Sequence, residues 1–445
     1  MTAGPEHDPF NPLRTQLRAI LTTRDVGTVS ALARDHVDVT GLQEVAAIGD
    51  RVRIGEAVHG EILSIDAAHC RVLTEGATAG LRLGMSVVNL GAPMIAPCEG
   101  WLGRVIDAYG AAMDGRPLPL GDIPRAIWSA PPQPTARRGL GGRLGTGLAV
   151  CDTLLPLVRG QRIGLFAGSG VGKSRLLAAL ATAVEADVIV IGLIGERGRE
   201  VRDFIADTLG EAALPKCVIV AATSDRAALS RARAAGTMMS VAEHFRDTGR
   251  HVLVLADSIT RFAEAQSELA AVAGEPFGPS GFPASMAQMV MSLAERAGPG
   301  GEGQGDITAV FSVLVAGSDM EGPVADIMRG VLDGHIVLSR EIAERGRFPA
   351  IDVLASVSRA LPGAATAREL SLITRARHLL GAYARAELML QSGLYVAGSD
   401  PTTDAAIAVR DDLDAFVGME SGGSVKESFE RLEEVLGVKA APAVD

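Results

Sequence analysis

Residues 167–174 of the chain read AGSGVGKS, a glycine-rich stretch placed between a predicted strand and a predicted helix. The strand is the apolar run at residues 162–166, and the helix repeats its apolar residues at helical spacing from Leu176 to Val184. Glycines let backbone N–H groups come close to a polyphosphate, and the N-terminus of the helix adds positive potential at the same place. The stretch therefore predicts a phosphate-binding loop, or P-loop, and an α/β domain built around it.

Individual residues of this loop have predicted roles. We expect Lys173 to reach the β- and γ-phosphates of a nucleotide and Ser174 to place its hydroxyl on Mg²⁺. The strict pattern begins with glycine, whereas this chain has Ala167, the smallest substitute. A chance glycine-rich turn is the alternative, and the flanking strand and helix disfavour it. The loop residues predicted to bind nucleotide are Gly168, Ser169, Gly170, Val171, Gly172, Lys173, Ser174 and Arg175.

Length and composition limit the class of protein. A chain of 445 residues is long enough for two to three domains. The net charge is −11 and only 4% of the residues are aromatic, so a nucleic-acid-binding surface is not expected. The four cysteines lack C-x-x-C spacing, which disfavours a zinc site and a disulfide framework. With no secretory signal and no apolar run long enough to span a bilayer, we expect a soluble, cytoplasmic protein.

The pattern along the chain predicts four segments. Residues 11–25 predict an amphipathic helix, which either packs on its own domain or docks on a partner or on anionic lipid. We assign residues 1–26 to this docking helix. Short runs separated by turn residues predict a small β-barrel at residues 27–100, for which a structural role is preferred over nucleic-acid binding. The domain that contains the P-loop follows at residues 101–365, and helical periodicity predicts a helical domain at residues 366–445.

Four continuous apolar runs predict strands of a parallel sheet that is covered on both faces. Polar residues follow each run, and ligands of open α/β sheets bind at the carboxyl ends of the strands. We therefore expect these polar residues to converge near the P-loop. The runs are residues 188–194, 217–222, 252–256 and 309–315, and the polar stretches that follow them are residues 195–197, 223–225, 257–258 and 317–319.

Two carboxylates in these polar stretches are candidates for chemistry. Phosphoryl transfer to water needs a metal clamp, an oriented water and positive charge on the departing phosphate. Asp257 is predicted to be a metal-linked carboxylate, with the N-cap of the helix that begins at Ile259 as the alternative role. Glu196 is predicted to polarise the attacking water, with a solvated loop carboxylate as the alternative.

Longer motifs carry a family resemblance. Residues 195–201 (GERGREV) resemble the catalytic-glutamate motif of the rotary-type ATPases, the relatives of the ATP synthase β subunit, and residues 257–263 (DSITRFA) resemble their second metal motif. Three further stretches make the resemblance more specific, namely residues 333–340 (DGHIVLSR), 348–359 (FPAIDVLASVSR) and 395–401 (YVAGSDP). Together these motifs resemble the ATPases of type III protein export, most closely the flagellum-specific form, from about residue 90 to residue 420.

The resemblance implies a homohexameric ring with each ATP between two subunits. In that pattern Arg359 matches an arginine finger that reaches the site of a neighbour, and Arg197 matches an arginine near the γ-phosphate. Phe348 and Tyr395 match positions that frame the adenine. From the residues alone, Arg359 could form an ordinary surface ion pair, and the two aromatic residues would more often belong to a core. The implied catalytic residues are Glu196, Lys173, Arg197 and Arg359, the implied metal ligands are Ser174 and Asp257, and the implied cofactor is Mg²⁺ with ATP.

The resemblance also implies a function and a set of partners. The enzyme would hydrolyse MgATP to energise or prime type III export of flagellar proteins, by releasing substrates from chaperones and delivering them to the export gate. Its partners would be export substrates, chaperones, the membrane export gate and a stalk-like regulator bound through residues 11–25. It would lie in the cytoplasm, peripherally associated with the export apparatus of the inner membrane.

Four alternatives remain open at this point. The first is the same enzyme in a virulence injectisome. The second is the catalytic subunit of a rotary proton-translocating ATPase, disfavoured because Glu196 and Arg359 occur on one chain. The third is a hexameric RNA translocase, disfavoured by the acidic charge and the few aromatic residues. The fourth is a non-catalytic nucleotide-binding scaffold, disfavoured because Lys173, Asp257 and Glu196 are all present.

Overall fold

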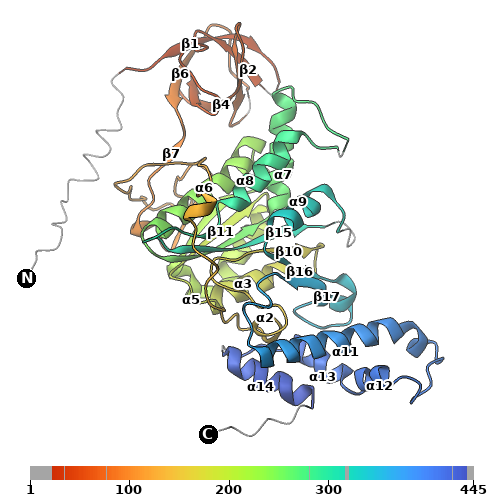
Figure 1. Cartoon of the computed structure of the whole chain (residues 1–445). Coiled ribbons are helices and arrows are strands. Elements are labelled where there is room, and N and C mark those ends of the chain that lie inside the picture. The colour runs from red at the N-terminus through yellow and green to blue at the C-terminus, as the bar shows by residue number, and fades with distance from the viewer. Residues whose placement is uncertain are drawn as a thin grey trace, which may run out of the picture.

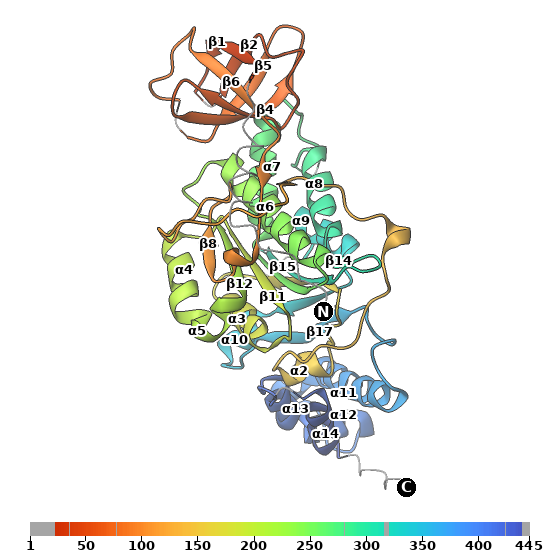
Figure 2. The ribbon, with the colours of Figure 1, turned by 90° about the vertical axis from the view of Figure 1, so that its left-hand side faces the viewer.

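The structure is a computed structural model that describes residues 23–34, 36–76, 78–279, 281–315, 320–422 and 424–437. A small β-barrel lies at one end, a sheet covered by helices lies in the middle, and a group of helices lies at the other end (Figure 1; Figure 2). The helix predicted for residues 11–25 lies outside the described residues up to residue 22, and residues 23–25 are not helical. Among the described helices, none has the length and apolar character needed to cross a membrane.

The barrel is formed by six short antiparallel strands that close in the order β1-β2-β5-β4-β3-β6. Its strands alternate between core and surface, as Val37 and Val39 of β2 show, because successive side chains of a strand point to opposite faces. The prediction of a small N-terminal barrel is confirmed. The strands are β1 (Val26–Leu32), β2 (His36–Thr40), β3 (Arg51–Ile54), β4 (Val58–Ile65), β5 (Cys70–Thr74) and β6 (Ser86–Gly91).

The central sheet has the strand order β17-β16-β10-β15-β13-β11-β12-β8, and β14 pairs with β15. Its strands from β16 to β8 run parallel, whereas β17 pairs antiparallel with β16 and β14 pairs antiparallel with β15. The strands are β8 (Arg104–Ile106), β10 (Arg162–Ala167), β11 (Val188–Ile194), β12 (Cys217–Ala222), β13 (His251–Asp257), β14 (Gly298–Pro299), β15 (Asp306–Leu314), β16 (Gly334–Leu338) and β17 (Ile351–Ser358). A separate pair joins β7 (Met94–Ile95) to β9 (Arg125–Ala126).

Both faces of this sheet are buried, which explains the continuous apolar runs of its strands. On β11, Ile189 and Ile191 belong to the core that includes α3 (Lys173–Ala183), whereas Val188 and Val190 belong to the core that includes α6 (Ala228–Asp247). The other helices of this part are α2 (Ala149–Asp152), α4 (Gly198–Asp203), the π-helix η3 (Phe204–Thr208), α5 (Gly210–Ala213), α7 (Ile259–Val272), α8 (Ala284–Glu295), α9 (Pro323–Val331) and α10 (Arg340–Glu344), together with the 3₁₀ helices η1 (Glu99–Trp101), η2 (Pro134–Ala136) and η4 (Leu214–Lys216).

The barrel is attached to the central part through a buried charged residue. Arg233 of α6 is 1% exposed, pairs with Glu61 of β4 and lies over the ring of Tyr109, 4.7 Å from its centroid. Arg51 of β3 lies over the same ring at 4.7 Å and pairs with Glu75 at 2.9 Å. A buried charge is stable only with such a partner, so the barrel and α6 are fixed to one another at this point.

The C-terminal part is helical, as predicted. Its longest helix begins with a capping box, in which Thr366 accepts a hydrogen bond from the backbone of Glu369 and the Glu369 side chain accepts one in return. Asp152 of α2, which is fully buried, accepts hydrogen bonds from the Thr146, Ser421 and Ser428 hydroxyls and so holds the C-terminal helices to the sheet. The helices are α11 (Ala367–Gln391), α12 (Pro401–Ala408), α13 (Arg410–Val417) and α14 (Val425–Val435).

Candidate active site

The P-loop connects β10 to α3, as predicted from its sequence. Gly170 and Gly172 have φ angles of 79° and 92°, in the left-handed region that residues with a side chain rarely adopt. Gly172 is the N-cap of α3, so Lys173 and Ser174 begin the helix and lie at its positive end. Ala167, which replaces the first glycine of the strict pattern, is the last residue of β10 and is fully buried.

A cleft of about 1240 Å³ opens over this loop at the carboxyl ends of the strands. All eight predicted loop residues, Gly168 to Arg175, line it, together with Glu196 and Arg197. The cleft is also lined by residues to which the sequence assigned no individual role, among them Thr260, Arg261, Glu264, Arg340 and Glu344. They come from the first turns of α7 and from α10, two helices that follow strands whose ends meet at the P-loop.

Lys173 is the centre of the charged groups in the cleft. Its Nζ atom pairs with Asp257 at the end of β13 and lies 3.3 Å from Glu196 Oε1, just beyond the end of β11. Burial raises the pKa of both carboxyl groups above the usual values, and the charge of Lys173 opposes this rise. Lys173, Asp257 and Glu196, which the sequence predicts to bind phosphate, bind the metal ion and polarise the attacking water, therefore contact one another in one network.

The geometry excludes the N-cap alternative for Asp257 and the solvated-loop alternative for Glu196, whereas their metal and water roles stay predictions. Ser258, and not Asp257, caps α7, because its side chain accepts a hydrogen bond from the backbone N–H of Arg261. Glu196 is not a solvated loop carboxylate, since its side chain is 18% exposed and paired with Lys173. Gly195, with a φ angle of 71°, allows this turn, and a Cβ atom there would lie 2.7 Å from Arg261 Cβ.

The two arginines predicted to be catalytic are both exposed. Arg197 lines the cleft, but its side chain is 82% exposed and lies 3.4 Å from Glu200 Oε1. Arg359 follows β17, and its Nη2 atom donates to the carbonyl oxygen of Arg329 at 3.2 Å. Arg359 is absent from the lining of its own subunit's cleft among the described residues.

The two aromatic residues predicted at the adenine lie in different places. A Cβ atom on Gly172 would lie 3.4 Å from the Phe348 ring, so Phe348 is beside the P-loop, and its side chain is half exposed. Tyr395 lies in the connection between α11 and α12, where its hydroxyl donates to Asp404 Oδ1 at 2.9 Å. Neither ring lines the cleft among the described residues, so the place of Tyr395 at the adenine stays a prediction. The turn at Gly418 packs beside Phe348, since a Cβ atom added to Gly418 would lie 3.3 Å from the Phe348 carbonyl oxygen.

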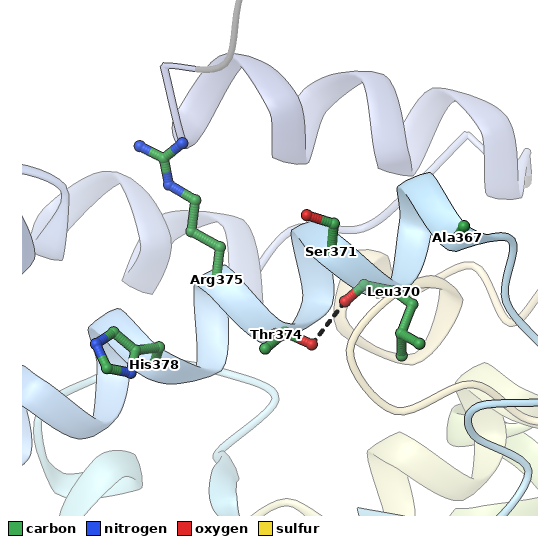
Figure 3. A pocket seen from close by; sticks show the side chains of 6 residues that line it. All are labelled: Ala367, Leu370, Ser371, Thr374, Arg375 and His378. Carbon is green, nitrogen blue, oxygen red and sulfur yellow. Dashed lines mark hydrogen bonds between the residues drawn. The ribbon is translucent and has the colours of Figure 1, made fainter.

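The polar stretch predicted at residues 317–319 lies outside the described residues. A second hollow, of about 580 Å³, lies over one face of α11, far along the chain from the P-loop (Figure 3). All of its lining residues come from this one helix, and none of them is a carboxylate or a predicted site residue. They are Ala367, Leu370, Ser371, Thr374, Arg375 and His378.

Comparisons with known proteins agree with this geometry. The nucleotide-binding domain of the ATP synthase alpha/beta family matches residues 147–358, and the T3SS EscN ATPase C-terminal domain matches residues 365–434. The chain is 42% identical over 424 residues to the flagellum-specific ATP synthase of Caulobacter vibrioides, covering 92% of this chain and 95% of that protein. It is 40% identical over 432 residues to a type 3 secretion system ATPase of Pseudomonas syringae pv. syringae, covering 94% and 95%.

A solved structure has the same fold. It is the assembled ATPase EscN from the type III secretion system of enteropathogenic E. coli, with a TM-score of 0.87 and 37% identity over 92% of this chain and 100% of that chain. A second structure, of EscN with its central stalk EscO, has a TM-score of 0.85. The chain therefore belongs to the ATP synthase alpha/beta family and, within it, to the ATPases of type III secretion and flagellar export.

Proposed function

We propose that the chain is the ATPase of flagellar protein export and that it hydrolyses MgATP as a homohexamer. The observation that carries the proposal is the contact of Lys173, at the start of the helix after β10, with Asp257 at the end of β13 and with Glu196 just beyond the end of β11. Flagellum-specific relatives from Caulobacter vibrioides and Pseudomonas aeruginosa are each 42% identical to it. An injectisome ATPase is the second candidate, supported by the likeness to EscN. A co-purified chaperone or a neighbouring gene would distinguish the two.

The residues present fit a nucleotide-bound Mg²⁺ ion. Mg²⁺ takes oxygen ligands and is commonly held by one or two protein groups together with substrate phosphates. Ser174 supplies a hydroxyl beside Lys173, and Asp257 supplies a carboxylate that is 5% exposed. No group of three His, Cys, Asp or Glu side chains among the described residues could hold a metal without the nucleotide. When bound, the ion would neutralise charge on the phosphates.

The other residues would bind and orient the reacting groups. The N–H groups of Gly168 to Ser174 would bind the phosphates at the start of α3, and Lys173 would move from the carboxylates to the β- and γ-phosphates. Glu196, released from Lys173, would then accept a hydrogen bond from the attacking water. Arg359 of a neighbouring subunit would stabilise the charge of the transition state, which explains its absence from its own cleft.

The proposed partners follow from the same family. We propose that export substrates, their chaperones and a membrane export gate bind the assembled ring, and that residues 11–25 bind a stalk-like regulator. The solved complex of EscN with its central stalk supports an ATPase of this fold acting together with a stalk. The net charge of −11 supports the expectation that nucleic acid is not a partner.

We expect the specific ATPase activity to rise with protein concentration, because a cleft completed by a neighbour is complete only in the assembled ring. Steady-state hydrolysis and light scattering on the same samples measure the two quantities. Activity that increases as hexamers appear supports the ring. Constant activity from a monomer would leave the P-loop assignment in place and contradict the role of Arg359.

We expect Phe348→Ala to weaken ATP binding about tenfold, because a stacked aromatic ring contributes about 1–3 kcal/mol to binding of a base. Tyr395→Ala is the matched control, since Tyr395 lies in the α11–α12 connection, and it should change the affinity by less than about twofold. A titration with a fluorescent ADP analogue measures both. If the Tyr395 variant weakened binding and the Phe348 variant did not, the position of the adenine would be wrong.

A further inference from the structure

Ser312 is a buried hydroxyl in an otherwise apolar stretch of β15. It is 0% exposed, and the residues on either side of it, Phe311 and Val313, are also fully buried. β15 lies between β10, which leads into the P-loop, and β13, which ends at Asp257. Since Ala256 is opposite Phe311 in the parallel register, Ser312 is level with Asp257.

The Ser312 hydroxyl donates to Asp257 Oδ1 at 2.7 Å. The side chain of Lys173 pairs with the same oxygen, whereas Asp257 Oδ2 accepts no hydrogen bond from the part of the chain that the structure describes. The terminal torsion of an aspartate has a broad energy well, so a fixed donor on one oxygen selects the orientation of the carboxylate. The orientation selected here leaves Oδ2 available to a metal ion or to its water ligands.

The importance of Ser312 increases when a nucleotide binds. Lys173 then moves to the phosphates under the proposed mechanism, and Ser312 is left as the described donor to Asp257. A hydrogen bond to a buried, charged group is stronger than one between neutral groups, so the loss of this donor should be measurable.

We propose that Ser312 is a positioning residue that orients the Asp257 carboxylate for binding of the Mg²⁺–nucleotide complex. This inference rests on the proposed function, because it requires Asp257 to act toward the metal. It assigns no direct contact between Ser312 and the nucleotide.

Binding of a fluorescent ADP analogue, with saturating Mg²⁺ and with EDTA, tests the proposal on the full chain. Ser312→Ala should reduce the gain in affinity that Mg²⁺ gives by about five- to tenfold and leave the affinity in EDTA within about twofold of wild type. Ser312→Thr, which keeps the hydroxyl, should recover the gain. Ser312→Cys keeps about the same volume but is a weaker hydrogen-bond donor, so its Mg²⁺-dependent gain in affinity should lie between those of the wild type and Ser312→Ala. This variant keeps the test valid if Ser312→Ala folds poorly.

Thr308→Val is the matched control on the same strand. Thr308 is also fully buried, but its hydroxyl lies 2.8 Å from His251 Nε2 and accepts from the Gly160 N–H, with no contact to Asp257. It should lower the thermal unfolding midpoint and leave the Mg²⁺ gain unchanged.

The two possible failures are distinguishable. If Mg²⁺ increased the ADP affinity of the wild type and of Ser312→Ala by the same factor, this inference alone would be overturned. A wild type that binds ADP equally well with and without Mg²⁺ would overturn the proposed metal role of Asp257 and the inference with it.

Discussion

Replacing Glu196 by glutamine should leave MgATP binding in place and slow hydrolysis about 10²- to 10³-fold. Glutamine keeps the size of the side chain but cannot accept a proton or carry the charge that polarises a water. Lys173 remains paired with Asp257 in this variant, so the P-loop keeps a partner for its buried charge. Equilibrium binding of a fluorescent ATP analogue and steady-state turnover measure the two effects separately.

Glu344→Gln is the matched control for this experiment. Glu344 lies on α10 and lines the same cleft, so the variant changes the charge of the cleft by the same amount. We expect its turnover to stay within about threefold of wild type, since no step is assigned to this residue. Turnover of Glu196→Gln at the wild-type rate would remove the role assigned to Glu196.

Mixing two inactive variants should restore activity if Arg359 acts on a neighbouring subunit. We expect Lys173→Ala to lose nucleotide binding and hydrolysis, and Arg359→Ala to lose about 10³-fold in turnover while still binding ATP. In randomly mixed rings, an intact Lys173 faces an intact Arg359 at about one interface in four. Part of the wild-type turnover should therefore return.

The control is the double variant with both substitutions on one chain, mixed with either single variant. A mixture of the double variant with Arg359→Ala contains no intact Arg359, so it should stay inactive. Absence of recovery in the first mixture, with mixed rings demonstrated by light scattering and by two differently tagged subunits, would contradict a site completed across subunits.

The sequence predicted the parts of the fold that depend on local patterns. Strands such as β11 and β13 are apolar along their whole length because both faces are buried, and this pattern identified them with their ends correct to within a residue. The position of the P-loop followed from its glycines, because few other residues adopt the φ angle of Gly172. Asp257 was predicted at the site because the carboxyl end of a strand is a defined place in this fold.

The remaining site residues depend on contacts between distant segments. Tyr395 lies in a motif that resembles the family, but this motif is in the connection between two helices. The sequence of such a connection does not determine which part of the molecule it contacts. Ser312 gave no signal, since one hydroxyl in an apolar strand is indistinguishable from a satisfied core serine until its partner is known. The turn at Gly418 reaches Phe348 only through the packing of the C-terminal helices on the sheet.

The contact of Lys173 with two carboxylates has a consequence for the binding of inorganic anions at the P-loop. An empty P-loop with a free lysine would attract any inorganic anion, because backbone N–H groups and a positive charge converge there. Here Lys173 is paired with Asp257 and Glu196, so a sulfate or inorganic phosphate ion would have to break these ion pairs in order to bind. Such an ion lacks the base and the linked phosphates with which ATP makes further contacts. We therefore expect sulfate and inorganic phosphate to be weak competitors of ATP at this loop.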